Sequence, residues 1–265
     1  MTTETETSAP ERAPPASNGR RVVILGALSA IAVATARIYA GEGAKLLLVA
    51  RNGERLDRIA ADLRARGAAS VDTAAIDLAS EAANARQHLS GWVKTIGGID
   101  HALLFYGYLG DQSAAQTDPE ELSRILAVNF TSAAQWSEAI AAHYRKQDRG
   151  ALVVISSVAG DRGRQSNYAY GAAKGGISLF IQGLAHSLAP TGAHATAIKL
   201  GFVDTPMTDS MDKSGPLWAT PAQVAPMIHK AAEKGGPFHY GPWFWRWIML
   251  IIRSVPAFIM HRTKL

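Results

Sequence analysis

The fold of this chain is decided by residues 21–32, RVVILGALSAIA, where an apolar run passes through a turn of small residues into a helical pattern. Five further apolar runs follow, at residues 45–50, 71–76, 101–105, 151–156 and 194–200. Each run is apolar over most of its length, which is typical of strands that are covered on both faces of a sheet. We therefore predict buried strands at these positions.

Segments with helical spacing, such as residues 54–66 and 122–146, lie between the apolar runs. Strand–helix alternation of this kind implies a parallel sheet with right-handed crossover connections. We predict an α/β fold, a Rossmann-type doubly wound parallel sheet in a single domain over residues 20–241. Ligands bind such a sheet at the carboxyl ends of its strands, so functional residues are expected just after the strands.

Composition and charge exclude several classes of site. The chain has no cysteine, which excludes disulfides, thiolate nucleophiles and Cys-ligated zinc, and we expect no metal. The formal net charge is +5, but the basic residues are scattered except near the C-terminus, which argues against a nucleic-acid groove. Residues 1–19 are rich in Thr, Glu, Ala and Pro without an apolar run, so we expect a disordered tail, no secretory signal and a cytoplasmic protein.

The turn after the first apolar run is a candidate phosphate site. Small residues there let backbone N–H groups and the positive end of a helix approach a pyrophosphate. Only Gly26 is a glycine, and Ala30 and Ala32 occupy the other two close-approach positions. A tight turn without a ligand is the alternative, but its place at the first strand favours a cofactor site. We predict that Gly26, Ser29, Ala30 and Ile31 contact this cofactor.

The residues after the second and third runs bear on the choice of cofactor. A NAD site usually has an acid at the end of the second strand, where this chain has Ala50 followed by Arg51. The Arg51 guanidinium could pair with a 2′-phosphate, so NADP(H) is favoured over NAD(H), although a solvated arginine at a helix start is the alternative. Asp77 and Leu78 follow the third run, and Asp77 could accept a hydrogen bond from the adenine amino group or cap a helix.

Tyr170 and Lys174 are four residues apart and share a helical face. Reduction of a ketone needs a proton donor, and a neighbouring ammonium lowers the pKa of a phenol, which makes Tyr170 a usable acid or base. Tyr168 is an internal control, because Ala172 stands four residues after it. Ser157 follows a strand and could hydrogen-bond the substrate oxygen, whereas Asn129 within a helical pattern is expected to make a tertiary hydrogen bond.

In order and spacing, these motifs resemble those of the short-chain dehydrogenase/reductase family over residues 21–240. The resemblance is carried by Gly26, Ala30, Ala32, Asp77, Gly107, Asn129, Ser157, Tyr170, Lys174 and residues 201–205. It implies a nicotinamide-dependent oxidoreductase that moves a hydride to or from a carbonyl or alcohol carbon.

The resemblance also implies a role for each matching residue. Tyr170 would be the proton donor and Ser157 would polarise the carbonyl. Lys174 would lower the pKa of the tyrosine and bind the ribose, and Asn129 would hold a water in the proton relay. The cofactor site would also include Gly107, with Val203 and Thr205 at the nicotinamide amide.

The chain departs from the family pattern at three places. Residues 104–107 read Leu-Phe-Tyr-Gly where Asn-Asn-Ala-Gly is usual, Leu200 replaces a usual proline, and the turn after the first strand has lost two glycines. These departures put the cofactor geometry in question. They leave open a non-catalytic NADP(H)-binding module that acts through partner contacts.

A closer resemblance links residues 104–111, residues 156–163 and the end of the chain to the keto-reducing subunits of decaprenylphosphoryl-ribose 2-epimerases. It implies a polyprenyl-phosphate-linked 2-keto sugar as substrate and a separate flavin oxidase as partner. A soluble ketone or 3-oxoacyl reductase is the alternative. The helical patterns 122–146 and 168–188 resemble the pair at the family's dimer interface, so a homo-oligomer is expected.

Residues 242–265 form an apolar and basic C-terminal segment. Arg246 and Arg253 are seven residues apart among tryptophans and aliphatic residues, and these arginines with Pro256 make a poor membrane span. Tryptophan and arginine together suit a helix in the headgroup layer, with Arg262 and Lys264 reaching anionic lipid. The alternative is an apolar tail packed on a partner subunit or over the substrate cleft. A membrane adaptor without catalysis would leave the Tyr170 motif unexplained.

Overall fold

A seven-stranded parallel sheet forms the centre of the computed structural model, which describes residues 19–209 and 211–263. Its strands are β1 (Arg21–Leu25), β2 (Lys45–Ala50), β3 (Ser70–Ala75), β4 (His101–Leu104), β5 (Gly150–Ser157), β6 (Ala193–Leu200) and β7 (Phe238–Gly241). They lie in the order β3-β2-β1-β4-β5-β6-β7, so the order reverses between β1 and β4. The predicted doubly wound α/β fold is confirmed.

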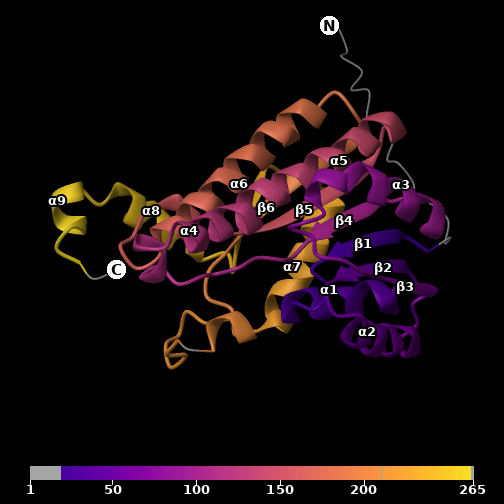
Figure 1. The fold of residues 1–265 in the computed structure, drawn as a ribbon, viewed down its shortest axis with the longest axis horizontal. Helices are drawn as coiled ribbons and strands as arrows, with labels where there is room; N and C mark the ends of the chain where they lie inside the picture. The colour runs from indigo at the N-terminus through magenta and orange to yellow at the C-terminus, as the bar shows by residue number, and fades with distance from the viewer. Residues whose placement is uncertain (1–18, 210, 264–265) are drawn as a thin grey trace, which may run out of the picture.

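Helices cover both faces of the sheet. They are α1 (Ala30–Gly41), α2 (Gly53–Ala65), α3 (Ala85–Ile96), α4 (Pro119–Leu126), α5 (Ser132–Gln147), α6 (Tyr168–Leu188), α7 (Pro221–Lys234), α8 (Trp245–Ser254) and α9 (Ala257–Met260). Helices α1, α2 and α7 lie on one face, and α3, α5 and α6 lie on the other (Figure 1).

The two-sided cover explains why the strands are apolar without alternation. In β1, Val22 and Ile24 face the core beneath α1 and α7, and Val23 and Leu25 face the core beneath α3 and α5. All four side chains are 0% exposed. Successive side chains of a strand point to opposite faces, so a sheet that is buried on both faces needs apolar residues at every position.

The structure corrects two details of the sequence prediction and leaves a third untested. The helix expected over residues 122–146 is interrupted by a π-turn, Ala127–Thr131, between α4 and α5. Strand β7 was not predicted, because its four residues carry no apolar run. Of the tail expected to be disordered, residues 1–18 lie outside the described part of the chain.

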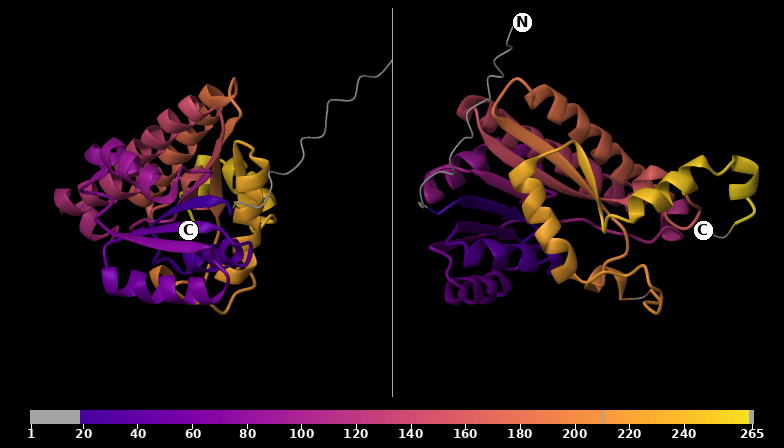
Figure 2. Two further views of the ribbon diagram at one scale, coloured as in Figure 1. Left: turned by 90° about the vertical axis from the view of Figure 1, so that its right-hand side faces the viewer. Right: turned by 180° about the vertical axis from the view of Figure 1, so that it is seen from behind.

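The C-terminal arm, which we define as residues 242–263, comprises α8 and α9 and projects beyond the sheet at the end opposite α2 and α3 (Figure 2). Trp245 and Met249 on α8 are buried against Val158. Within the described ranges, none of the helices has the length and apolar character needed to cross a membrane.

Candidate active site

The carboxyl ends of the strands bring the predicted catalytic residues together. Ser157 ends β5, and the first turns of α6 carry Tyr170 and Lys174 beside it. Helix α6 approaches the turn after β5 closely, because a Cβ on Gly171 would lie 2.8 Å from the carbonyl oxygen of Ala159. Small residues on this face of α6 therefore place the Tyr170 and Lys174 side chains next to Ser157.

Ser156 on β5 bonds to α6. Its hydroxyl donates to the carbonyl oxygen of Lys174 at 2.9 Å and lies 2.7 Å from the Ser178 hydroxyl, which bonds to the same carbonyl oxygen within the helix at 2.8 Å. The Lys174 ammonium in turn donates to the carbonyl oxygen of Ile155, at 3.0 Å. The lysine is thereby positioned from both its backbone and its side chain, and it is only 4% exposed.

Burial determines the protonation of Tyr170 and Lys174. It raises the pKa of Tyr170 to about 12, against the effect of a hydrogen bond with Ser157 that lowers it. Burial also lowers the pKa of Lys174 to about 8. The expected lowering of the Tyr170 pKa by Lys174 is not found, because the ammonium lies 5.7 Å from the ring centroid and is bonded to Ile155. Tyr170 therefore holds its proton at neutral pH, as a donor to a carbonyl must.

Asn129 lies in the π-turn that separates α4 from α5. Its amide nitrogen donates to the carbonyl oxygens of Ile125, at 2.8 Å, and Tyr108, at 2.6 Å, and its side-chain oxygen accepts from the Tyr108 N–H at 3.0 Å. These contacts confirm the expected tertiary hydrogen bonding of this buried asparagine. They also tie the helix to the loop after β4, where a Cβ on Gly107 would lie 3.0 Å from the Asn129 oxygen. A π-turn at a functional residue is a recurrent arrangement, and the water-holding role of Asn129 stays a prediction.

The turn after β1 has the geometry of a phosphate site. Gly26 has a φ of +85°, which favours glycine, and a Cβ there would lie 2.5 Å from the Tyr106 backbone nitrogen. Ser29 is the N-cap of α1, and in the described chain its side chain makes no capping hydrogen bond. The N–H groups of Ala30 and Ile31 at the first turn therefore remain available to an anion.

Tyr106 accounts for one departure from the family pattern. It stands where a small residue is usual, packs under Gly26 and exchanges a hydrogen bond with the Ser132 hydroxyl at 3.1 Å. Burial raises its pKa far above the ordinary range. Tyr106 thus ties the loop after β4 to the turn after β1 and to α5.

Arg51 and Asp77 lie together at the adenine end of the site. The Arg51 guanidinium is 75% exposed and lies 3.9 Å from Asp77, so it has room to meet a phosphate. Asp77 accepts the N–H of Ala79 at 2.8 Å with one oxygen, which closes a turn and caps no helix, and the other oxygen faces Arg51. The neighbouring Leu78 is buried, and its carbonyl oxygen accepts from the Trp136 indole at 2.8 Å.

The loop after β6 holds the residues expected at the nicotinamide. Val203 is buried and pairs with Ala219 in an isolated parallel bridge. The Thr208 hydroxyl donates to the carbonyl oxygens of both Val203 and Thr205, each at 2.9 Å. The loop is thus rigid at the edge of the sheet nearest Ser157. Together with the uncapped α1 and the free side of Arg51, it fits a dinucleotide across the switch in strand order.

A cavity of about 150 Å³ opens beside Tyr170. Gln112 and Asn167 line it, and neither was singled out from the sequence. The Gln112 oxygen accepts from the Ala169 N–H at 2.8 Å, which leaves its amide nitrogen without a partner, and the Asn167 oxygen is also unpaired in the described chain. The only sequence signal for such residues is their place in loops after a strand or before α6. The lining of the cavity thus combines these polar side chains with apolar ones such as Leu109 and Ile125.

Comparisons with known proteins agree with this geometry. A family model described as short chain dehydrogenase matches residues 20–215. An uncharacterized oxidoreductase of Mycobacterium tuberculosis is 38% identical over 241 residues, which cover 91% of this chain and 96% of that protein. A Streptomyces violaceoruber protein named as a ketoacyl reductase of the granaticin polyketide synthase is 31% identical over 212 residues, 79% of this chain and 76% of that protein.

Solved structures share the fold at low identity. A variant of actinorhodin polyketide ketoreductase with NADPH has a TM-score of 0.74 and 23% identity, and the match covers 83% of this chain and 92% of that one. Xylitol dehydrogenase with bound NAD+ has a TM-score of 0.74 and 21% identity, with 84% and 97% covered. The neighbours thus include both cofactors, and they do not decide between them. The chain belongs to the short-chain dehydrogenase family, and it is an NAD(P)-dependent oxidoreductase of that family.

Proposed function

We propose that this chain reduces a ketone to an alcohol with NADPH. The observation that carries the proposal is Tyr170 at the wall of the cavity, hydrogen-bonded to Ser157 at the end of β5 and with the Lys174 ammonium 5.7 Å from its ring centroid. The bound nicotinamide supplies a hydride to the carbonyl carbon. Ser157 would polarise the carbonyl, and Tyr170 would donate its proton to the carbonyl oxygen, so that an alcohol results. Lys174 would bind the ribose, and Asn129 would connect Tyr170 to solvent through a water.

A tyrosine substitution separates catalysis from cofactor binding. We expect Tyr170→Phe to lower kcat by roughly 10²–10⁴-fold, the usual effect of losing a general acid, while the Kd for NADPH measured by fluorescence stays nearly unchanged. Tyr168→Phe is the matched control, because it lies on the same helix with its side chain 45% exposed. If the wild type binds cofactor but no carbonyl compound gives Tyr170-dependent oxidation, the non-catalytic module is the correct function.

The preference for NADP(H) rests on Arg51. Its exposed guanidinium stands after β2, where no acid is present to hold two ribose hydroxyls. We expect Arg51→Ala to weaken NADPH binding by about ten-fold or more, since a hydrogen bond to a charged group is worth roughly 1.5–3 kcal/mol, and to leave NADH binding unchanged. Arg58→Ala on α2 is the control, because its side chain is 77% exposed. Equal losses for NADPH and NADH would contradict a 2′-phosphate contact.

For the substrate we propose a polyprenyl-phosphate-linked 2-keto sugar, made by a separate flavin oxidase and reduced at the cytoplasmic face of a membrane. The polar side chains of Gln112 and Asn167 in the lining of the cavity support a hydroxylated substrate. A soluble ketone or 3-oxoacyl group is the second candidate, supported by the relative named as a ketoacyl reductase. NADPH consumption with each substrate class, run beside Tyr170→Phe, distinguishes them. Turnover of soluble ketones alone would exclude the lipid-linked sugar as the substrate.

We further propose a homo-oligomer in which α5 and α6 face a second copy. A groove between them is lined by Phe130, Leu179 and Phe180, and Leu179 is 70% exposed. Gly183 on the groove has open space where a Cβ would stand, which allows another helix to approach closely, whereas the Phe130 ring fills the corresponding space at Gly176. Leu179→Glu is expected to halve the mass measured by light scattering, and an unchanged mass would refute this interface.

A further inference from the structure

The C-terminal arm presents an apolar surface that nothing in the described chain covers. Its exposed side chains have fractional exposures between 45% and 72%, and they are Trp243, Trp247, Leu250, Ile251, Phe258 and Ile259. Exposed aromatic and aliphatic residues that gather in one segment mark a binding surface, whereas single exposed apolar residues are ordinary.

The opposite side of the arm is firmly packed, so the exposed side is presented in a defined direction. Trp245 and Met249 are 2% and 0% exposed. The Trp245 indole meets Phe202 edge-to-face at a centroid distance of 5.3 Å. Arg162 donates to the carbonyl oxygens of Arg253 and Val255, at 3.3 and 3.0 Å. Helix α8 of the arm is therefore packed on the domain with one face and exposes an apolar face on the other side.

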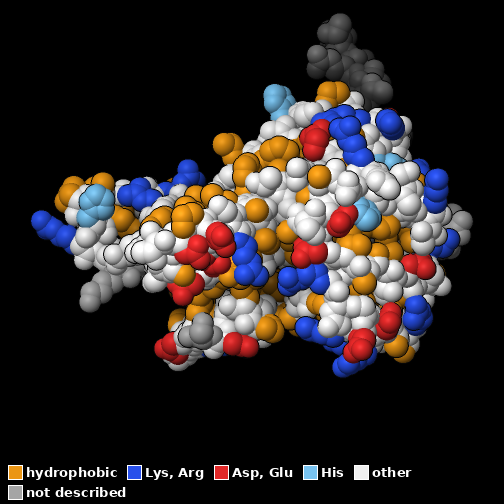
Figure 3. All heavy atoms as spheres, in the orientation of Figure 1, with side chains coloured by type: hydrophobic (Ala, Val, Ile, Leu, Met, Phe, Trp, Pro, Cys, Tyr) orange, Lys and Arg blue, Asp and Glu red, His pale blue; other side chains and the backbone are white. Residues whose placement is uncertain are grey.

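The same surface is basic. Arg246, Arg253 and Arg262 are exposed among the apolar residues, and residues 242–263 contain no Asp or Glu. Asp161, in the turn against which α8 packs, is already paired with the Lys199 ammonium at 2.6 Å. The tip of the arm accordingly carries hydrophobic and basic side chains side by side in Figure 3.

We propose that the outer face of the C-terminal arm docks on an anionic lipid bilayer. Tryptophan and arginine on one short amphipathic helix suit the headgroup layer, where indole rings lie at the interface and guanidinium groups meet phosphates. Arg246 lies 5.7 Å from the centroid of the Trp247 ring, so a guanidinium for lipid phosphates and an indole for the interface lie side by side. A second copy is the less suitable occupant, because a two-fold axis through this face would bring arginines together without any carboxylate to pair them.

Docking would place the active site at the lipid surface. Helix α8 packs on the turn that follows Ser157, and the Trp245 indole fills the space over Gly201, where a Cβ would otherwise stand. Both contacts lie at the carboxyl ends of β5 and β6, where Ser157 pairs with Leu200. The docking surface stands independently of the proposed reaction, whereas its use for a lipid-linked substrate rests on that proposal.

Sedimentation of the full chain with vesicles tests this surface without any substrate. The protein is mixed with vesicles of phosphatidylcholine alone, or of equal parts phosphatidylcholine and phosphatidylglycerol. We expect binding to the anionic vesicles and none to the zwitterionic ones. Each arginine near an anionic surface contributes about five-fold in affinity, so Arg246→Gln with Arg262→Gln should weaken binding by about 25-fold.

Two further variants keep the test decisive. Arg58→Gln with Arg86→Gln removes the same charge from exposed positions of α2 and α3 and should bind like the wild type. Ile251→Asn should weaken vesicle binding while NADPH binding in solution stays unchanged. The proposal is overturned if the wild type ignores both vesicles, if the control pair weakens binding equally, or if the arm variants instead lower the molecular mass in solution. NADPH turnover is measured separately, so it tests the proposed reduction whether or not the protein binds vesicles.

Discussion

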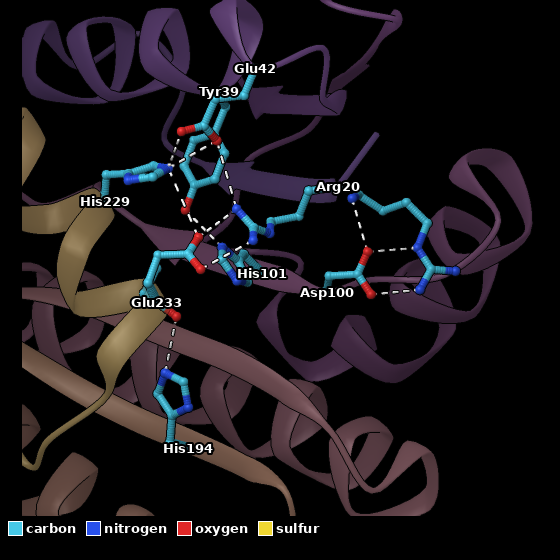
Figure 4. A network of polar contacts seen from close by, with 10 residues as sticks. Arg20, Tyr39, Glu42, Asp100, His101, His194, His229 and Glu233 are labelled. Atoms are coloured by element: carbon cyan, nitrogen blue, oxygen red, sulfur yellow. Dashed lines mark hydrogen bonds and ion pairs between the residues drawn. The ribbon is translucent and has the colours of Figure 1, made fainter. Parts of the chain in front are cut away.

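Acid stability should depend on one buried histidine, His101. It begins the central strand β4, at the end of the sheet opposite the active site. Figure 4 shows its surroundings, where α1 and α7 meet the start of β4. The Tyr39 hydroxyl lies 2.8 Å from Nδ1 of His101, and both side chains are buried. Burial, with the nearby Arg20 guanidinium, lowers the pKa of His101 from 6.5 to about 3.

The sign and size of the effect follow from this pKa. Between pH 6.5 and about 3, the unfolded chain binds a proton at His101 that the folded chain excludes. Folding is therefore favoured above pH 6.5 and loses stability as the pH falls through this window. At pH 5, about 1.5 units below the ordinary pKa, the loss is about 2 kcal/mol, at about 1.36 kcal/mol per unit.

Urea unfolding at pH 8 and pH 5 measures this loss. His101→Asn keeps an oxygen to accept the Tyr39 hydroxyl and removes the titrating group. Between pH 8 and pH 5, the free energy of unfolding of this variant should therefore fall by about 2 kcal/mol less than that of the wild type. His186→Asn, at an exposed position of α6, is the control. Burial also lowers the pKa of His194, but that contribution is common to all three proteins and cancels. Equal pH dependence in the wild type and His101→Asn would refute the reasoning.

Two further predictions concern the active site. The pKa of Lys174 is lowered to about 8 and that of Tyr170 is raised to about 12, so kcat/KM for NADPH should fall about ten-fold from pH 7 to pH 9 as the ammonium loses its proton. Lys174→Arg stays charged, so its kcat/KM should not fall between pH 7 and pH 9. If the variant shows the same fall as the wild type, another group is responsible for it. Gly26→Ala should destabilise the fold by about 1–3 kcal/mol, because it adds backbone strain and a contact with Tyr106. Thermal unfolding with and without NADPH measures it, and a neutral effect would contradict the close approach.

The fold was predictable because most of its strands are buried on both faces. A parallel sheet under two helical layers requires continuous apolar runs, and β1, β2, β4, β5 and β6 have them. The predicted burial of β3 is wrong, because this strand lies at the edge of the sheet and only Val71 in it is buried. β7 could not be predicted, because Phe238–Gly241 includes a polar histidine and a glycine and pairs only along β6. The π-turn at Ala127–Thr131 was also missed, since the apolar spacing of α4 and α5 continues through it. In this turn Asn129 bonds to Tyr108 in the loop after β4 and to the Ile125 carbonyl oxygen of α4.

The catalytic side chains were identified from spacing, but their protonation was not. The four-residue interval from Tyr170 to Lys174 places both on one helical face, and this predicted an ammonium that lowers the pKa of the phenol. Burial instead raises it, because desolvation disfavours the phenolate and the ammonium is bonded to the Ile155 carbonyl. Gln112 and Asn167 escaped notice because loop residues have no periodicity that marks a cavity.

Local chemistry was thus determined by the sequence itself: which segments are strands, where the small-residue turn lies, and which residues share a helical face. Tertiary structure alone decided how far each group is from water and from its neighbours. It buried Trp245 and left Trp247 exposed within one apolar segment. The physical reason is that periodicity records the direction of a side chain about its own helix axis. Burial and electrostatic environment depend on which distant residues pack against that side.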